Sequence, residues 1–178
     1  MDRQKFRHKH VEPGSPGEGG PIRVAIGRAP GQVIITASKE DLSDAQISAT
    51  IKTASVNTDS EFRDKHLRSD EFFNADSFPV MTFVSTGVEK AGDRYKITGN
   101  LTMRDITKPV VLDAKYNGQV TSGGGTKAGF KATTTIDRFE FGTKWNKAIE
   151  TGGLIVGKNV EITLLLELNK VTGEQKGK

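Results

Sequence analysis

Apolar and polar residues alternate along most of the chain after residue 31, as expected for strands with one buried face and one wet face. The segment VEITLLLEL shows this most clearly, because one of its faces carries only Val160, Ile162, Leu164, Leu166 and Leu168. The same period of two occurs in six further segments, at residues 32–37, 46–53, 80–86, 95–103, 110–116 and 130–136. A weaker island, IRVAI at 22–26, is compatible with a short edge strand.

These segments predict an all-β protein with an antiparallel sheet. Glycine-rich turns such as AGD, SGGG and TGG separate them, and the strand–helix alternation of a parallel sheet is missing. A long meander has to hide its two edges, either by packing two sheets together or by closing into a barrel. We favour the barrel, with Gly99 marking a bend or bulge in the strand at 95–103.

One helix is predicted near residues 58–73, between the strand segments at 46–53 and 80–86. Thr58, followed three residues later by Glu61, fits a capping box, in which each side chain bonds a free backbone amide at the helix start. A lone helix in an all-β chain is expected to cap one end of the barrel.

The length of 178 residues fits one domain, which we place at 31–170. A Gly- and Pro-rich arm, residues 1–30, precedes it and a tail, residues 171–178, follows; both are expected to lie outside the core. The chain has no cysteine, which excludes disulfides and thiol chemistry. No apolar run approaches the roughly 18 residues of a membrane span. The start, MDRQKFRHKH, lacks the apolar stretch of a secretory signal, so the sequence as written predicts a cytoplasmic protein.

His66, within RDKHLRSDEFF, is the candidate for acid–base chemistry. A general base needs a nucleophile or substrate group within reach, and neither a Gly-x-Ser-x-Gly nor a Ser-x-x-Lys motif is present to supply one. The other histidines, His8 and His10, lie in the arm, so we expect no metal site, no cofactor and no catalytic residue. The alternative role for Arg63, His66 and Arg68 is structural hydrogen bonding or the binding of an anionic group.

Nucleic acid and nucleotides are not expected as partners. The net charge is only +4, and the strand aromatics lie mostly on apolar faces, where they cannot stack on bases. The segment GGLIVGKN at 152–159 resembles a phosphate-binding loop, but it ends in Asn159 where a hydroxyl is needed and leads into a strand. It therefore predicts a hairpin turn.

Three long segments carry a family resemblance. They are ASVNTDSEFRDKHLRSDEFFNADSFPVMTFVST, then YKITGNLTMRDITKPVVLDAKYNG, and then AGFKATTTIDRFEFGTKWN followed by GGLIVGKNVEITLLLEL. In this order, over about residues 31–170, they resemble the YceI-like family of lipocalin-like, polyprenyl-binding proteins. The resemblance implies an eight-stranded antiparallel barrel that holds a long isoprenoid lipid in an apolar tunnel. It also implies a non-enzymatic role in transport or storage of isoprenoid quinones or their precursors, a link to stress responses, and a periplasmic location in many members.

On this hypothesis the ligand lies against the inner strand faces. We predict that its lining consists of Phe83, Ile97, Leu101, Leu112, Phe130, Ile136, Phe141, Trp145, Ile162 and Leu164. Arg63, His66 and Arg68 are then expected near a polar headgroup at the opening flanked by the helix. Two alternatives stay open, namely a hydrolase or isomerase that uses His66 as base, and a stress-related interaction protein with a filled core.

Residues 1–30 depart from the family pattern, which begins with a strand bearing a His-Ser pair and a long second strand with a Gly-x-Phe motif. Only the stretch from Gly31 to Thr36 matches the end of that second strand. Three explanations are open. Residues 22–26 substitute as an edge strand, a second subunit of a homodimer supplies the edge, or the reading frame is displaced before about residue 31.

Overall fold

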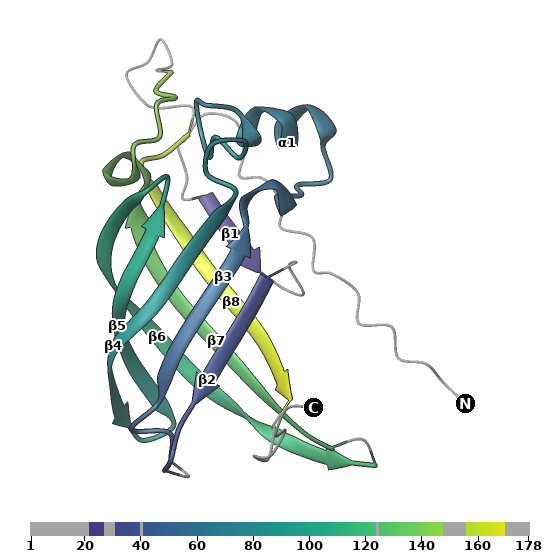
Figure 1. Ribbon diagram of the computed structural model, residues 1–178, viewed down its shortest axis with the longest axis vertical. Coiled ribbons are helices and arrows are strands. Elements are labelled where there is room, and N and C mark those ends of the chain that lie inside the picture. The colour runs from purple at the N-terminus through teal and green to yellow at the C-terminus, as the bar shows by residue number, and fades with distance from the viewer. Residues whose placement is uncertain (1–21, 27–30, 40, 124, 148–155, 170–178) are drawn as a thin grey trace, which may run out of the picture.

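The alternating segments form eight strands in one strongly curled sheet, with one short helix at its end (Figure 1). The structure is a computed structural model, and it describes residues 22–26, 31–39, 41–123, 125–147 and 156–169. The predicted arm (apart from 22–26), the tail and most of the turn at 152–159 lie outside these residues. The strands are β1 (Ile22–Ile26), β2 (Gly31–Thr36), β3 (Gln46–Lys52), β4 (Val80–Ala91), β5 (Arg94–Met103), β6 (Ile106–Ser122), β7 (Gly125–Asp137) and β8 (Asn159–Asn169).

The strand order is β1-β8-β7-β6-β5-β4-β3-β2. Every pair from β2 to β8 is antiparallel, which confirms the predicted fold class. Two details differ from the prediction of a closed antiparallel barrel. The edge strand β1 is present but runs parallel to β8, and within the described residues no register joins β1 to β2. We call the line between β2 and β8 the open seam.

The inner faces are those that the alternation predicts, and they build two adjoining apolar clusters. The central cluster consists of Phe83, Tyr95, Ile97, Leu112, Ala114 and Ala132. The helix-side cluster consists of Met103, Ile136, Phe141 and Val160. Leu101 and Val110 pack against both clusters, so one continuous apolar column runs along the inside of the sheet.

The predicted irregularity at Gly99 is a close packing contact, and the bulge itself lies on the neighbouring strand. The register of β4 with β5 shifts between Ser85 and Gly87. Gly99 pairs with Ser85, and a Cβ built on it would lie 2.4 Å from the Cζ atom of Phe83. The same Cβ would lie 2.6 Å from the backbone oxygen of Val84, which cannot turn away as a side chain can, so glycine is required here.

Replacing Gly99 with alanine is expected to lower the free energy of unfolding by about 1–3 kcal/mol, the usual range for overpacking a core. Gly129→Ala in β7 is the matched control, because its Cβ would meet only ordinary contacts at 3.6 Å. Urea unfolding of both variants measures the difference. Equal stabilities would contradict the packing role of Gly99.

The sheet is split between the first half of β6 and the last part of β7. The β6–β7 register begins at Asp113 and Thr133 and runs toward the hairpin turn. Residues 106–112 are paired with β5 and residues 134–137 with β8, and in the described chain neither stretch is paired with the other. Pro109 lies in this first part of β6, which is paired with β5 but has no register with β7. Proline has no N–H to donate and is confined to sheet edges and bulges, which accords with the split.

The helix α1 (Glu61–Arg68) is shorter than predicted and is capped by a different residue. Ser60 is the N-cap, with its side chain accepting from the Arg63 amide. The predicted capping box at Thr58 is wrong, because the Thr58 amide and hydroxyl both donate to the buried carboxylate of Asp64, at 2.8 and 2.7 Å. A short 3-10 helix, η1 (Thr53–Ser55), precedes α1, and another, η2 (Arg138–Phe141), follows β7. Of the helices that the structure describes, none has the length and apolarity needed to cross a membrane.

Candidate ligand-binding site

Nine of the ten predicted lining residues lie along the apolar column. Phe83, Ile97 and Leu112 are buried in the central cluster, and Ile136 and Phe141 in the helix-side cluster. The half-buried residues Leu101, Ile162 and Leu164 pack against these clusters. Phe130 lies on the same face of β7 as Ala132 and Ile136, with its ring centroid 5.3 Å from that of Tyr116. The tenth residue, Trp145, lies beside α1. Contact of these residues with a ligand stays a prediction.

The inner face of β8 is less buried than a filled core would make it. Ile162, Leu164, Leu166 and Leu168 share the face of the buried Val160, yet all four are only half-buried. Most of their partners on β7 have small side chains; for example, Leu164 pairs with Ala132 and Leu168 pairs with Ala128. Val33 and Ile35 on β2, across the open seam, are half-buried as well. Protein cores are close-packed, so these half-buried side chains keep more accessible apolar surface than a fully packed core would leave.

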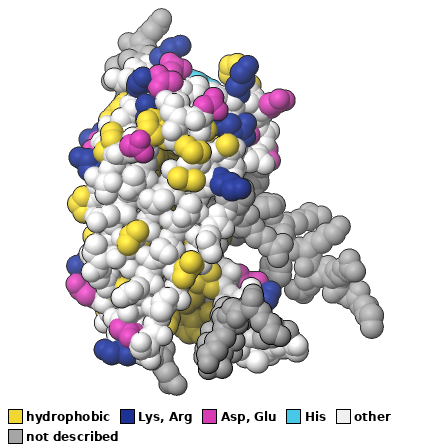
Figure 2. Space-filling view, in the orientation of Figure 1, with side chains coloured by type: hydrophobic (Ala, Val, Ile, Leu, Met, Phe, Trp, Pro, Cys, Tyr) yellow, Lys and Arg dark blue, Asp and Glu magenta, His cyan; other side chains and the backbone are white. Residues whose placement is uncertain are grey.

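Figure 2 shows hydrophobic side chains gathered in a hollow on the lower part of the visible face. In Figure 1 this is the region between β2 and the end of β8 that lies away from α1. Residues 165–169 of β8 are paired with β7 and, among the described residues, not with a strand on the other side. Among the described residues, this end of β8 is therefore an unpaired strand edge beside the apolar interior.

The opposite end of the barrel carries α1 and an aromatic group formed by His66, Phe72 and Trp145 (Figure 1). The ring of His66 meets Phe72 edge-on at 4.9 Å and Trp145 at 5.8 Å, and the Phe72 and Trp145 centroids are 5.6 Å apart. The His66 Nε2 atom lies 2.6 Å from the Glu71 carboxylate. The Glu71 carbonyl also accepts from the Trp145 amide, which fixes the tryptophan against the turn after α1.

Arg138 is the central polar residue of this end, although only 2% of it is exposed. Its guanidinium donates to the carbonyls of Trp145, Val156 and Gly157 at 2.7, 3.1 and 2.9 Å and to the Thr143 hydroxyl at 3.3 Å. Burial lowers the pKa of Arg138, and the nearby Asp137 carboxylate opposes this. An arginine stays charged in proteins even so. It therefore ties the loop after η2 to the start of β8 with four charge-assisted hydrogen bonds.

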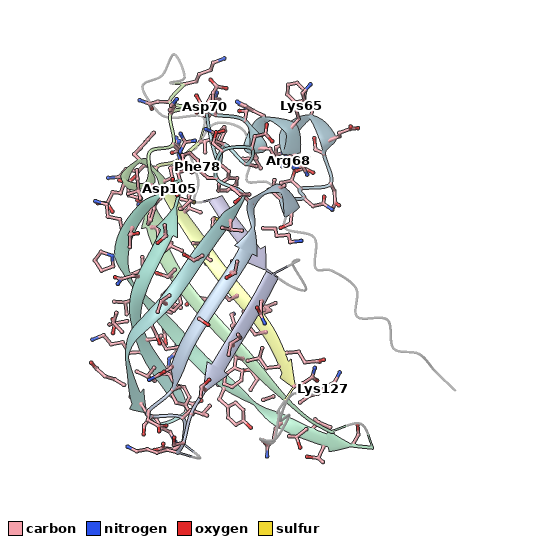
Figure 3. All side chains as sticks on the ribbon, in the orientation of Figure 1. Lys65, Arg68, Asp70, Phe78, Asp105 and Lys127 are labelled. Atoms are coloured by element: carbon pink, nitrogen blue, oxygen red, sulfur yellow. The ribbon has the colours of Figure 1, made fainter. Side chains whose placement is uncertain are left out.

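A second arginine, Arg104, connects β5 to the turn after α1. It donates to the carbonyls of Asp70 and Phe72 at 2.9 and 2.6 Å, and it lies 3.5 Å from the Asp70 carboxylate. Lys144 binds the same carboxylate at 2.5 Å. The Lys144 hydrogen bond, followed by the charges of Lys144 and Arg104, lowers the pKa of Asp70, so this carboxylate stays ionised. In Figure 3, Asp70 lies at the α1 end and Lys127 at the opposite end of the barrel.

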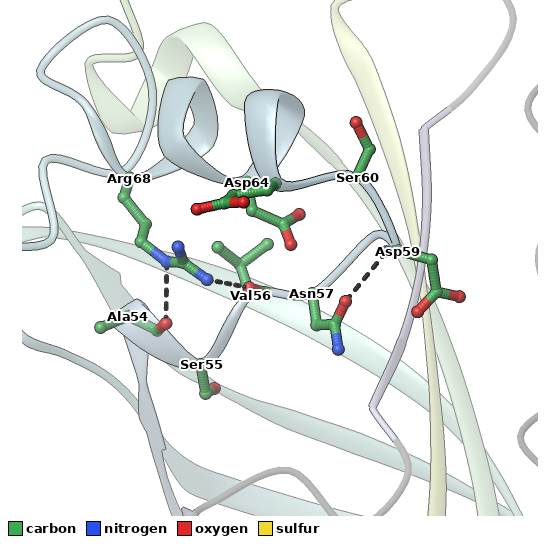
Figure 4. Close-up of a pocket in the computed structure, with 9 residues that line it drawn as sticks. Ala54, Ser55, Val56, Asn57, Asp59, Ser60, Asp64 and Arg68 are labelled. Atoms are coloured by element: carbon green, nitrogen blue, oxygen red, sulfur yellow. Dashed lines mark hydrogen bonds between the residues drawn. The ribbon is translucent and has the colours of Figure 1, made fainter.

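Two of the three predicted headgroup residues, His66 and Arg68, form hydrogen bonds within the protein. Arg68 donates to the carbonyls of Ala54 and Val56 at 2.9 and 2.7 Å, as Figure 4 shows. His66 is bound to Glu71, whereas Arg63 is exposed. A pocket of about 500 Å3 lies beneath α1 and is lined by both Arg68 and Asp64. A headgroup at this position stays a prediction.

Arg104 and Arg138 are the residues that sequence reasoning missed. The only available signal was that Arg138 holds the next alternate position after the inward-facing run that ends at Ile136. Their partners are mostly backbone carbonyls, which the sequence does not distinguish. Among the described residues, no group of three or more His, Asp or Glu side chains is arranged to hold a metal ion.

Comparisons with known proteins agree with this geometry. Residues 6–168 match the family model of the YceI-like domain. The curated "Protein YceI" of Salmonella arizonae is 48% identical over 107 residues, which is 60% of this chain and 56% of that protein. "Protein YceI" of Salmonella newport shows the same values. The chain thus spans about half the length of these relatives.

Solved structures extend the likeness to the whole fold. The Campylobacter jejuni YceI protein is 27% identical, with a TM-score of 0.69 over 96% of this chain and 94% of that one. BcnA of Burkholderia cenocepacia is 19% identical, with a TM-score of 0.67 over 78% of this chain and 84% of that one, which shows the shared fold alone. Because the family match covers nearly the entire curled sheet and its helix, this chain belongs to the family of YceI-like domains.

Proposed function

We propose that the protein binds a long-chain isoprenoid inside the curled sheet and carries or stores it without catalysis. The half-buried inner face of β8 carries the proposal, because Ile162, Leu164, Leu166 and Leu168 point inward and keep unburied apolar surface. A filled core would bury these four side chains. A bound hydrocarbon chain completes their burial.

The energetics favour a long and flexible apolar ligand. Burial contributes about 0.8 kcal/mol per CH2 group, so roughly fifteen carbons contribute on the order of 10 kcal/mol before the entropy cost of binding. The apolar column has no polar group that would select a particular chain atom, since its two clusters consist of hydrocarbon, Met103 and Tyr95. The Tyr95 hydroxyl donates to the Asp41 carbonyl, which leaves an apolar ring toward the inside.

Native mass spectrometry of the purified protein, followed by organic extraction and lipid analysis, tests the proposal. The expected result is a protein ion heavier than the chain by the mass of one bound lipid, with an isoprenoid in the extract. The same spectrum reports whether the chain forms a homodimer. A protein that stays free of lipid, and that fails to take up added ubiquinone or farnesol, would contradict the carrier role.

A further inference from the structure

The split between β6 and β7 forms a cleft of about 600 Å3 in the wall of the barrel. One side consists of residues 108–111 of β6, and the other of residues 134–137 of β7 with Glu140 and Phe141 of η2. The cleft lies where the strands lack a shared register. It is therefore a gap in the sheet itself, bordered by two strand edges.

The floor of the cleft is also the wall of the apolar interior. Val110, Ile136 and Phe141 line the cleft; Ile136 and Phe141 belong to the helix-side cluster, and Val110 packs against it. Phe141 is only 1% exposed, and because it lines the cleft and also belongs to the helix-side cluster, its ring lies between the two. Rotation of this hydrocarbon side chain would join the two spaces without breaking a hydrogen bond of its own.

The rim of the cleft is polar and has no excess of positive charge. Threonine hydroxyls come from Thr86, Thr98 and Thr135, and the charged rim residues are Lys108, Asp137 and Glu140. One cation faces two carboxylates, and Asp137 is also 3.8 Å from Lys158. With Lys158 counted, two cations balance two carboxylates, so such a rim suits a hydroxyl or carbonyl oxygen and offers no surplus cation to a phosphate or carboxylate head.

The end near α1 is a poorer entrance. Opening it would break the charge-assisted hydrogen bonds of Arg138 and Arg104 to five backbone carbonyls. Lids and entrances are drawn from the least strongly held parts of a fold. The split, with fewer ladder hydrogen bonds and a hydrocarbon plug, is such a part.

Building on the proposed function, we propose that the β6–β7 cleft is the side entrance to the barrel and the binding site for the ligand's head. The chain passes Phe141 into the apolar column, and an uncharged polar head, an alcohol or a quinone, stays among the rim threonines and Lys108. This assigns the ligand class as isoprenoids without a phosphate.

Single cysteines test the entrance, because the chain has none of its own. Val111→Cys places a thiol on the rim, and Ile34→Cys places one on β2 beside the open seam; both parent residues are 47% exposed. Val84→Cys, whose parent is 54% exposed on the outer face of β4, is the control. Each variant is loaded with radiolabelled farnesol, coupled to a bulky maleimide, and mixed with excess phosphatidylcholine vesicles.

We expect the Val111 adduct to release farnesol on the order of tenfold more slowly than its unlabelled form, while the other two adducts release it at unchanged rates. Equal rates for all three, or slowing at Ile34 alone, would overturn the side entrance. Failure of every unlabelled variant to hold farnesol would instead overturn the proposed function, and the entrance with it.

The headgroup assignment has its own measurement. Farnesol is expected to bind more tightly than farnesyl phosphate, and Glu140→Lys is expected to reduce this difference because it replaces a rim carboxylate with a cation. Thermal unfolding of Glu140→Lys checks that the exposed substitution leaves the fold intact. Tighter binding of farnesyl phosphate by the unchanged protein would refute an uncharged head.

Discussion

Leu164→Arg is expected to lower lipid retention on the order of a hundredfold or more, because an unpaired charge in an apolar site costs about 3 kcal/mol or more. Leu164 lies on the inner face of β8, opposite Ala132, and packs against the central cluster. Retention is measured as farnesol remaining on the protein after gel filtration.

Leu165→Arg is the matched control on the same strand. Its side chain lies on the outer face and is 50% exposed, so retention should be unchanged. Because a buried arginine also threatens the fold, Leu164→Trp provides a second variant, which fills the interior without adding a charge. It is expected to reduce retention while the circular dichroism spectrum stays that of a β-sheet protein. Undiminished retention in both Leu164 variants would show that the ligand lies elsewhere.

Arg138→Met is expected to lower the free energy of unfolding by about 3–5 kcal/mol, the range found when a buried charged network loses one partner. The guanidinium satisfies three carbonyls and a hydroxyl, and methionine leaves all four without this donor. The carbonyl of Trp145 is one of them. Since Trp145 is the only tryptophan, its fluorescence emission should shift to the red as the loop after η2 loosens.

Arg94→Met provides the comparison for Arg138. Arg94 forms an ion pair with Asp113 in which both side chains are about half exposed, and such surface pairs contribute roughly 0–1 kcal/mol. Urea unfolding should therefore separate the two variants clearly. An Arg138→Met protein as stable as Arg94→Met, with unchanged tryptophan emission, would contradict a structural role for Arg138.

The strand faces could be predicted from the sequence because the pleat is a local property. Alternation placed Phe83, Ile97, Leu112 and Ile136 on inner faces, and the structure buries all four. The helix boundaries could be predicted only roughly. Thr58 donates to the Asp64 carboxylate instead of capping the helix. This contact depends on how the loop before α1 folds back onto the helix.

The candidate site was harder to predict than the fold. Trp145 was predicted to line the ligand; its amide donates to the Glu71 carbonyl and its carbonyl accepts from Arg138, which places it beside α1, and its contact with a ligand stays a prediction. For Arg68 the sequence left structural hydrogen bonding and anion binding both open, and in the structure it donates to the loop carbonyls of Ala54 and Val56. Both placements depend on how other segments of the chain fold against these residues.

The sequence by itself determined the all-β class, the inward and outward faces of β3–β8, the approximate place of α1 and the family likeness, since these follow from local patterning and contiguous motifs. Only the tertiary structure decided where the sheet stays open, at the seam between β2 and β8 and at the split beside Pro109, and how Arg138 closes the α1 end. The physical reason is that a strand's pattern specifies which face is buried but not which neighbour it pairs with along its whole length. Openings therefore arise from long-range register.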